Sequence, residues 1–402
     1  MTSRRTVLLG SANGIALAAS GLLGRLAMAD LPRGAVDAAA LDTLPGKQPL
    51  LRRSFRPPNY ETPLAAFNDV ITPNDRFFVR WHLANIPQID VSAWRLDVGG
   101  DDATPSLQLS MDQLMHDFEP AELVAVCQCS GNRRGFSDPH VPGVQWGPGA
   151  MGNARWKGAR LKDILARAGI QKETVEVAFN GADRGPLDAT PPFVKSIPAW
   201  RALDENTLVA YAMNGAPLPH WNGFPARIIV PGWTATYWVK QVSAIRALSS
   251  PLKSFWMNTA YRIPKGKFPL VDRFVSQESE TSTPITEILV NSLITQPVEG
   301  ARLPAGKPVN VTGLAWDSGA GVRRVEVSLD GGGSWSTAEL GDDLGRFSFR
   351  PWRFSFTPVT AMKQVIMARA SNAQGMTQPS ELIFNAPGYH NNVVQRLTVD
   401  IA

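Results

Sequence analysis

The stretch LVAVCQCSGNRRGFSDPHVPGVQWGPGAMGNARWKGARLKDIL, residues 123–165, is the most informative part of this chain. It begins with an apolar run, Leu123–Val126, of the kind that forms a short buried strand. The composition changes at Ser130–Asn132 to that of a turn, so Cys129 is predicted to lie where a strand ends and a loop begins. The pair Arg133–Arg134 follows at once. Because fixed positive charge favours the thiolate, Cys129 is a candidate metal ligand or nucleophile.

Both cysteines also have a structural interpretation. Free cysteine is among the most buried residue types, so Cys127, inside the apolar run, is interpreted as a core residue. For Cys129 the residues alone leave both interpretations open, because a single cysteine has no metal-ligand spacing. A disulfide between two cysteines two positions apart would close a small, strained ring, so none is expected.

Length and composition limit the class of protein. The chain has 402 residues, of which 44% are hydrophobic and 19% are charged. This length can bury a large core and predicts two domains, and the composition is that of an ordinary globular protein. The formal net charge of +5 is too small to support nucleic-acid binding.

Residues 1–29 have the layout of an export signal. Arg4 and Arg5 precede a mildly apolar run without charge until Arg25, and Ala27–Ala29 offers a cleavage site of small residues. The paired arginines indicate the twin-arginine type, which exports folded proteins to the bacterial periplasm. A transmembrane anchor is the alternative, but glycines and serines make the run weakly hydrophobic. We expect a soluble periplasmic protein that is not bound to a membrane.

A longer ordered string within the opening stretch resembles a known family. Cys129–Arg134, then Trp146, then Gly149–Leu161 are similar to the molybdenum-cofactor segment of the sulfite oxidase family. The resemblance implies a molybdenum-molybdopterin cofactor (Mo-MPT). It also implies that the sulfur of Cys129 is the one protein ligand to the metal.

The resemblance and the residue pattern together give an α+β fold class. The family has a mixed α/β molybdopterin domain, here assigned to residues 30–284, followed by an all-β immunoglobulin-like domain, here 285–402. In the pattern itself, the polar segment Ser276–Thr283 is interpreted as a linker. Beyond it, alternating apolar residues such as those of 325–329 predict short strands with the spacing of a sandwich. The family uses this second domain for homodimerisation, so a homodimer is expected.

The segment FVRWHL at 78–83 places Arg80 and His82 on one face of an extended chain. By pattern alone such a pair is a solvated or hydrogen-bonded surface feature. The segment is similar to the family stretch in which the arginine binds the substrate oxyanion and the histidine contacts the cofactor. The resemblance extends the cofactor contacts to Phe78.

Further cofactor contacts are implied after the central stretch. Thr174–Phe179 and Ile228–Val230 are predicted strands, and an arginine at a strand end is usually exposed. The residues that match the family's cofactor contacts are Asp183, Ser196, Asn222, Arg227 and Lys240. Animal members have histidine at the position of Asn222, although asparagine can still donate a hydrogen bond.

The implied substrate pocket binds a small oxyanion. Guanidinium groups bind such anions through charge-assisted hydrogen bonds, which suits Arg80 and Arg134. The resemblance adds Trp146 as a pocket wall and Tyr261 as a hydroxyl donor. Ala260 stands where animal enzymes have an aspartate, so one carboxylate is missing near the metal. The family's arginine from near the chain end is not assigned here.

The resemblance implies oxidation of sulfite to sulfate. The chain has no Cys-x-x-Cys-His motif and only five scattered histidines, so no haem is expected in it and electrons are expected to pass to a separate periplasmic c-type cytochrome. One alternative is the molybdenum subunit of a sulfane-sulfur dehydrogenase that works with a dihaem cytochrome. A methionine-sulfoxide reductase subunit is disfavoured because that branch lacks the sandwich. A cofactor-free periplasmic binding protein is a further alternative, which the retained Cys129 disfavours.

Overall fold

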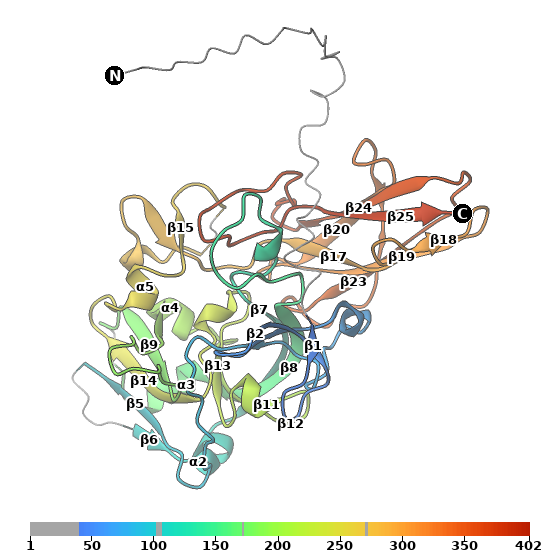
Figure 1. Cartoon of the computed structure of the whole chain (residues 1–402). Helices are drawn as coiled ribbons and strands as arrows, with labels where there is room; N and C mark the ends of the chain where they lie inside the picture. Colours follow the sequence, from blue (N-terminus) through green and yellow to red (C-terminus); the bar gives the residue numbers. More distant parts are fainter. Residues whose placement is uncertain (1–39, 102–106, 171–172, 270–271) are drawn as a thin grey trace, which may run out of the picture.

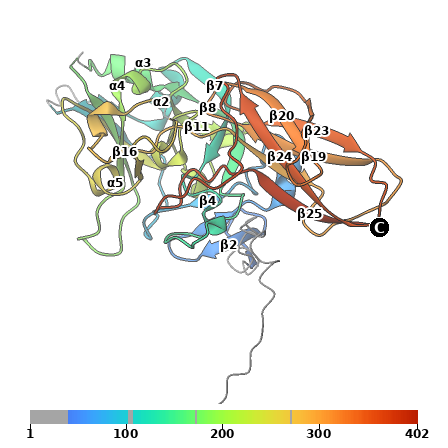
Figure 2. The same cartoon turned by 90° about the horizontal axis from the view of Figure 1, so that it is seen from above.

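The computed structural model describes residues 40–101, 107–170, 173–269 and 272–402 (Figure 1). The predicted export signal, residues 1–29, lies outside these ranges. Strands predominate and the helices are short. The described residues form a larger mixed part and a smaller all-β part, each with a hydrophobic core of its own. In Figures 1 and 2 the two parts lie against each other, the smaller one in orange and red.

The opening stretch forms the central hairpin of the larger part. Strand β7 (Pro120–Gln128) pairs antiparallel with β8 (Met151–Arg160), from Pro120 opposite Ala159 to Gln128 opposite Met151. The predicted strand is therefore confirmed but is longer than its apolar run. The sheet has the order β12-β11-β8-β7, with β13 also paired to β11. The remaining strands are β11 (Leu208–Met213), β12 (Ala216–Pro217) and β13 (Arg227–Ile229).

A second sheet of the larger part has the order β10-β9-β14-β5-β6. Its strands are β5 (Leu96–Gly100), β6 (Leu107–Leu109), β9 (Glu176–Gly181), β10 (Val194–Pro198) and β14 (Val242–Leu248). The strand predicted at 174–179 is therefore β9, displaced by two residues.

Helix α2 begins at a capping box, in which the Ser110 side chain and Gln113 bond each other's backbone N–H groups. The helices are α2 (Met111–His116), α3 (Leu161–Arg167), α4 (Ala199–Ala202) and α5 (Phe255–Asn258), with 3-10 turns η1 (Leu64–Asn68), η2 (Arg134–Phe136), η3 (His220–Asn222), η4 (Ala235–Tyr237) and η5 (Val275–Gln277).

A small N-terminal sheet supports the loop between β7 and β8. Its order is β1-β2-β3-β4. Glu61, at the end of β3, forms a buried ion pair with Arg53 at 2.7 Å and accepts hydrogen bonds from the backbone N–H groups of Gly147 and Gly149. Its strands are β1 (Leu41–Asp42), β2 (Leu50–Ser54), β3 (Asn59–Glu61) and β4 (Val79–Arg80).

The polar segment Ser276–Thr283, interpreted as a linker, forms regular structure and makes buried contacts. It begins within η5 and ends in β16 (Ser282–Pro284), which pairs with β15 (Arg262–Pro264). The Ser276 hydroxyl and the Gln277 amide both donate hydrogen bonds to the buried carboxylate of Glu176. The polar residues are therefore needed to satisfy a buried charge, a requirement that sequence pattern does not reveal.

The smaller part contains two sheets that share one core. Their orders are β17-β19-β23-β22 and β18-β25-β24-β20-β21. Two packed sheets agree with the predicted strands, while the specifically immunoglobulin-like topology stays a prediction. The strands are β17 (Asn291–Gln296), β18 (Arg302–Leu303), β19 (Val309–Trp316), β20 (Val322–Ser328), β21 (Ser336–Thr337), β22 (Glu339–Leu340), β23 (Arg350–Phe356), β24 (Lys363–Asn372) and β25 (Gln395–Ile401).

The chain between β24 and β25 returns to the larger part. In Figure 1 this red segment lies close to the green loop that follows β7. Asn391 donates a hydrogen bond to the carbonyl of Arg133, and Arg133 donates one to Asn291 at the start of β17. Tyr389 packs within the core of the larger part. The smaller part therefore helps to hold the loop that carries Cys129.

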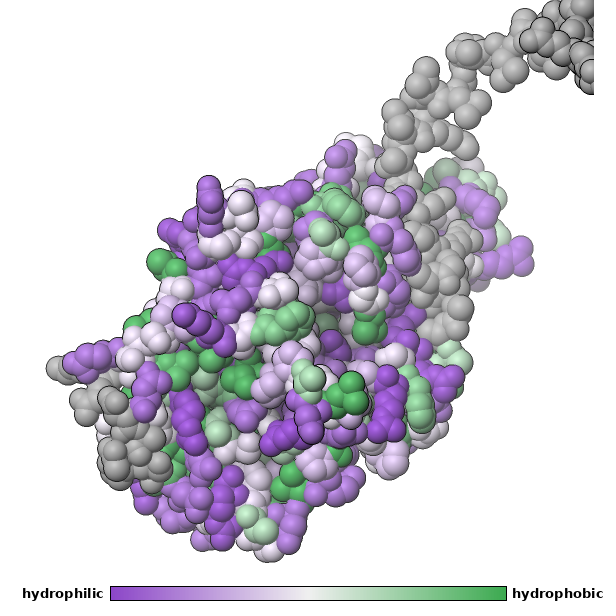
Figure 3. Space-filling model, turned by 60° about the vertical axis from the view of Figure 1, so that its left-hand side comes forward, coloured by the Kyte–Doolittle hydropathy of each residue, from purple (hydrophilic) through white to green (hydrophobic). Residues whose placement is uncertain are grey.

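The surface is mixed in polarity. Figure 3 shows hydrophobic residues interspersed with hydrophilic ones across one face of the molecule. In the portion of the chain that the structure describes, every helix is too short or too polar to cross a bilayer.

Candidate functional site

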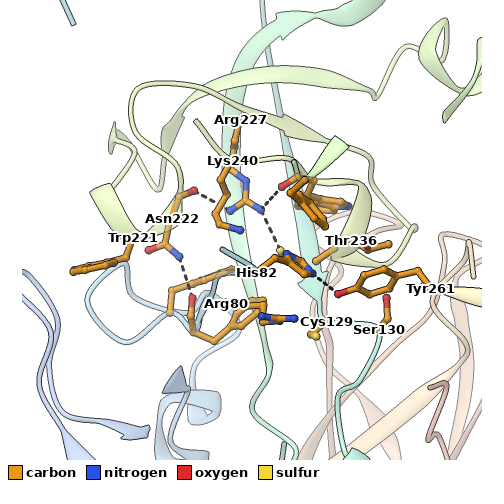
Figure 4. Close-up of a pocket in the computed structure, with 16 residues that line it drawn as sticks. Arg80, His82, Cys129, Ser130, Trp221, Asn222, Arg227, Thr236, Lys240 and Tyr261 are labelled. Atoms are coloured by element: carbon orange, nitrogen blue, oxygen red, sulfur yellow. Dashed lines mark hydrogen bonds between the residues drawn. The ribbon is translucent and has the colours of Figure 1, made fainter. Parts of the chain in front are cut away.

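A hollow opens in the larger part, and its lining residues come from segments far apart in the sequence (Figure 4). Eight of the twelve site residues expected from the sequence line it. They are Phe78, Arg80, His82, Cys129, Asn222, Arg227, Lys240 and Tyr261. Figure 4 shows two groups, with Arg80, Cys129, Ser130 and Tyr261 at one end and Asn222, Arg227 and Lys240 at the other.

Cys129 is held rigidly just beyond the end of β7. Its backbone N–H donates to the Ala150 carbonyl at 2.9 Å, and its carbonyl accepts from the Asn132 N–H at 3.0 Å. The residue is 7% exposed and lines the hollow. Cys127, two residues earlier, is buried as expected for a core residue, but it also lines the hollow. The two thiols share a face because side chains alternate along a strand.

Tyr261 and His82 form a buried pair beside Cys129. A hydrogen bond joins the Tyr261 hydroxyl to His82 Nε2, and the histidine ring stacks on Phe193 with centroids 3.8 Å apart. Burial, with the charges of Arg80 and Lys240, lowers the pKa of His82 well below its usual value. Burial raises the pKa of Tyr261. Both side chains are therefore neutral around pH 7, with a single proton in the bond between them.

The opposite end of the hollow is cationic. Arg227 donates to the backbone carbonyls of Asn222 and Trp238 at 3.0 and 3.2 Å. Lys240 Nζ lies 4.4 Å from the centroid of the Trp81 ring. Burial, followed by the charge of Arg227, lowers the pKa of Lys240 to about 7. Among the described residues, the ion pairs include neither Arg227 nor Lys240, so this end is suited to an anion.

Two expected substrate-pocket residues lie behind the lining. Arg134 donates to the Pro387 carbonyl at 2.8 Å and lies over the ring of Tyr389, which in turn stacks on Tyr261 with centroids 5.6 Å apart. Trp146 is fully buried, and within the described ranges its indole N–H has no hydrogen-bond partner. In this structure Arg134 supports the wall of the hollow through Tyr389, and Trp146 belongs to the core of the larger part.

Two expected cofactor contacts also lie outside the lining. Ser196 is buried and donates to the carboxylate of Glu176 at 2.6 Å, so its hydroxyl is already engaged. Asp183 is buried, which raises its pKa, while the charge of Lys240 opposes that shift. Asp183 therefore acts on the hollow through Lys240.

Sequence reasoning missed several residues that border the hollow. Lys195 is fully buried under Tyr261, with Nζ 5.2 Å from the ring centroid, and donates to the Trp256 carbonyl. Lys47 is buried and donates to Asn222. Phe193 and Tyr389 support His82 and Tyr261. The one available signal was that Lys195 immediately precedes Ser196, a position already matched to the family.

The polar atoms of the hollow fit an anionic organic cofactor with a metal. Arg227 Nε, Ser130 Oγ and Thr236 Oγ1 are buried, and over the described part of the chain they have no hydrogen-bond partner. Buried donors without partners require a bound group or ordered water. The same described ranges contain no cluster of three or more His, Cys, Asp or Glu residues arranged around a metal. A soft metal bound by the thiol of Cys129 would therefore need its other ligands from a cofactor.

Comparison with known proteins defines the class. Residues 82–256 match the model of the oxidoreductase molybdopterin binding domain, and residues 282–402 match that of the Mo-co oxidoreductase dimerisation domain. The chain is thus a molybdopterin oxidoreductase. It is 36% identical over 373 residues to mitochondrial sulfite oxidase of Rattus norvegicus, covering 89% of this chain and 67% of the relative. It belongs to the sulfite oxidase family.

The chain is also similar to a second sulfite oxidase, to a nitrate reductase and, in fold, to a sulfane dehydrogenase. Sulfite oxidase of Gallus gallus is 36% identical to this chain, and the match covers 86% of this chain and 76% of that protein. The NAD(P)H nitrate reductase of Hordeum vulgare is 30% identical over 90% of this chain and 42% of its own. The sulfane dehydrogenase SoxCD of Paracoccus pantotrophus has a similar fold, with a TM-score of 0.71, 24% identity and coverage of 86% of this chain and 85% of that one.

Proposed function

We propose that this protein oxidises sulfite to sulfate at a Mo-MPT centre and passes the electrons to a separate c-type cytochrome. The observation that carries the proposal is the convergence of the Cys129 thiol, the Arg80 guanidinium and the neutral His82–Tyr261 pair at one end of a hollow whose other end is cationic. The family membership and the names of the animal relatives support sulfite as the substrate.

The cofactor would be bound along the length of the hollow. Cys129 would donate its thiolate sulfur to molybdenum, and Arg227, Lys240 and Asn222 would bind the anionic end of the molybdopterin. Bound there, the cofactor would supply the two-electron oxidation and the transfer of an oxygen atom. Phe78 and His82 would contact its ring system, as the family resemblance implies.

Sulfite would be positioned by charge and hydrogen bonding. Arg80 donates to Asn59 Oδ1 at 3.1 Å and to the Trp81 carbonyl, contacts that hold its guanidinium at the hollow. The oxidation is balanced as sulfite plus water giving sulfate, two protons and two electrons. With neutral His82 donating its Nε2–H to the Tyr261 oxygen, the proton of the Tyr261 hydroxyl is free to make a hydrogen bond to an oxyanion.

The cellular setting is part of the same proposal. The twin-arginine signal predicted at residues 1–29 would deliver the folded protein to a bacterial periplasm, where a c-type cytochrome would accept the electrons. The match of residues 282–402 to a dimerisation domain supports a homodimer.

A second candidate function is sulfane-sulfur oxidation by a molybdenum subunit that works with a dihaem cytochrome. The fold similarity to the sulfane dehydrogenase SoxCD favours it. The position of Arg134 behind Tyr389 also makes the pocket less cationic than the sequence predicted, which suits a substrate with lower charge density.

The test is steady-state turnover by purified protein of known molybdenum content. Sulfite and thiosulfate would be offered as donors with cytochrome c or ferricyanide as acceptor, and nitrate as an alternative oxidant. We expect cytochrome reduction with sulfite and its loss in Cys129→Ser. Unchanged sulfite turnover in that variant would contradict the proposal. Molybdenum without sulfite activity would favour the sulfane-sulfur candidate, and absence of molybdenum would favour the cofactor-free binding protein.

A further inference from the structure

Lys47 lies behind the cationic end of the hollow, in the segment between β1 and β2 and outside the matched molybdopterin domain. Its side chain is buried, with the residue only 6% exposed. Nζ lies 2.5 Å from the Asn74 carbonyl, 3.1 Å from the Phe77 carbonyl and 2.5 Å from Asn222 Oδ1. Three oxygen acceptors match the three N–H donors of an ammonium group. Burial lowers the pKa of Lys47 to about 7, while the charge of Asp75 opposes that shift.

This contact and the bond from Asn222 Nδ2 to the Phe78 carbonyl together set which way the Asn222 amide faces. An ammonium group has donors only, so it must meet the amide oxygen of Asn222 and not the amide nitrogen. The nitrogen, Nδ2, then lies on the other side, where it donates to the Phe78 carbonyl at 3.1 Å. In Figure 4 this bond is the dashed line below Asn222. One N–H of Nδ2 is used by Phe78. Among the described residues Nδ2 has no second acceptor, and Asn222 lines the hollow.

The orientation matters because Asn222 is next to the two cations of this end. Its backbone carbonyl accepts from Arg227, and both Asn222 and Arg227 line the hollow with Lys240. If the amide were reversed, its oxygen would face the hollow and repel an anion bound by Arg227 and Lys240. With Lys47 in place, all three side chains present donors. Three donors at one end of the hollow, two of them cationic when protonated, are suited to a phosphate group.

We propose that Lys47 is a positioning residue that fixes Asn222 as a hydrogen-bond donor to the phosphate of the bound molybdopterin. The proposal rests on the proposed function for the presence of that cofactor. It assigns a binding role to the N-terminal segment, since Lys47 and Asn222 are 175 residues apart in the chain. It also explains how asparagine can serve at this position: because Lys47 occupies Oδ1, the group left to bond the cofactor is the Nδ2 donor.

The test measures release of molybdopterin from the purified holoenzyme. Molybdenum and pterin that remain with the protein would be followed over time after transfer to cofactor-free buffer. Lys47→Met keeps the length of the side chain and removes the ammonium group, and it should speed release by about tenfold, the usual effect of losing an oriented bond to a charged group. Lys267→Met, at an exposed lysine, is the matched control and should release at the wild-type rate.

A second variant separates orientation from general loss of structure. Asn222→Asp keeps the acceptor for Lys47 but has no N–H, so it should also speed release while its urea-unfolding midpoint stays at the wild-type value. In the double variant Lys47→Met/Asn222→Leu, release should be no faster than in Asn222→Leu alone, because both changes remove the same donor. If Lys47→Met does not fold, Lys47→Gln, which keeps a polar group but removes the ammonium group, takes its place with the same expected result.

Three results would overturn the proposal. They are wild-type release in Lys47→Met, wild-type release in Asn222→Asp, and multiplicative effects in the double variant. Wild-type protein that never binds molybdopterin would overturn the proposed function and this proposal together. Wild-type protein that retains the cofactor without oxidising sulfite would affect the proposed substrate only, since cofactor release is measured without turnover.

Discussion

Tyr261 has two structural properties that suit it to bond a reacting anion. Its backbone has φ 59°, in the left-handed region that non-glycine residues rarely adopt, and its hydroxyl is bonded to a buried, neutral histidine. Strain of this kind persists where surrounding contacts hold the residue, and here Tyr389 stacks on one side of the ring. The hydroxyl is therefore held at a defined place in the hollow.

Tyr261→Phe should lower sulfite turnover by about 100-fold, because it removes one preorganised donor from a water-poor site. The molybdenum content should stay at the wild-type level, since the ring and its stacking are kept. The measurement is kcat with sulfite, normalised to molybdenum. Tyr211→Phe, at a buried tyrosine of β11, serves as the control. Equal turnover in the two variants would show that the Tyr261 hydroxyl has no part in the reaction.

At the scale of elements, the hairpin β7–β8 depends on the N-terminal sheet. The loop between the two strands carries Cys129, and the carboxylate of Glu61 holds its later part through the N–H groups of Gly147 and Gly149. At Gly149 a side chain would also collide with the chain, because a Cβ atom would lie 2.0 Å from the Thr62 carbonyl oxygen. Sheet and loop therefore pack as one unit.

Glu61→Gln should lower the free energy of unfolding by about 3 kcal/mol, because it removes one charge of the buried ion pair with Arg53. Urea unfolding of the variant and of Glu122→Gln would measure this. Glu122 forms an exposed pair with Arg155, and breaking such a pair costs less than about 1 kcal/mol. Similar losses in the two variants would refute the anchoring role of Glu61.

At the scale of the whole molecule, the segment 385–392 connects the two parts. Tyr389 enters the larger core, Asn391 bonds the carbonyl of Arg133, and His390 packs against Phe268. In the described portion of the chain, the buried Nε2 of His390 has no hydrogen-bond partner. Burial lowers the pKa of His390 to about 3.

The pKa of His390 predicts acid sensitivity. Because the folded pKa lies below the ordinary value of 6.5, the unfolded chain binds the proton first, and stability is lost as pH falls below about 6.5. His390→Asn, which tolerates the positive φ of this position, should reduce that loss by up to about 1.4 kcal/mol per pH unit between pH 6 and 4.5. Urea unfolding at several pH values measures it, and exposed His116→Asn should leave the slope unchanged. Part of the pH dependence of stability should remain in His390→Asn, because burial also lowers the pKa of His82.

The sequence alone predicted the features that depend on short-range pattern. The strand before Cys129 and the strands of the smaller part follow from local alternation of residues. The segment with Arg80 and His82 is extended only as far as Arg80, where β4 ends, and His82 lies in a bend, although both residues line the hollow. The ordered string around Cys129 also identified the family. These predictions succeed because strand formation and turn composition are set by neighbouring residues.

Only the tertiary structure decided which distant side chains meet. It placed Lys47 on Asn222 and Tyr389 between Arg134 and Tyr261, and it engaged Ser196 with Glu176. No local pattern marks these contacts, because burial lets a charge or hydroxyl remain only where the packed chain supplies its partner. The sequence by itself determined the family, the main strands and most of the residues at the site. The packing of the whole chain determined which of the expected site residues line the hollow and which, such as Arg134 and Ser196, lie outside its lining.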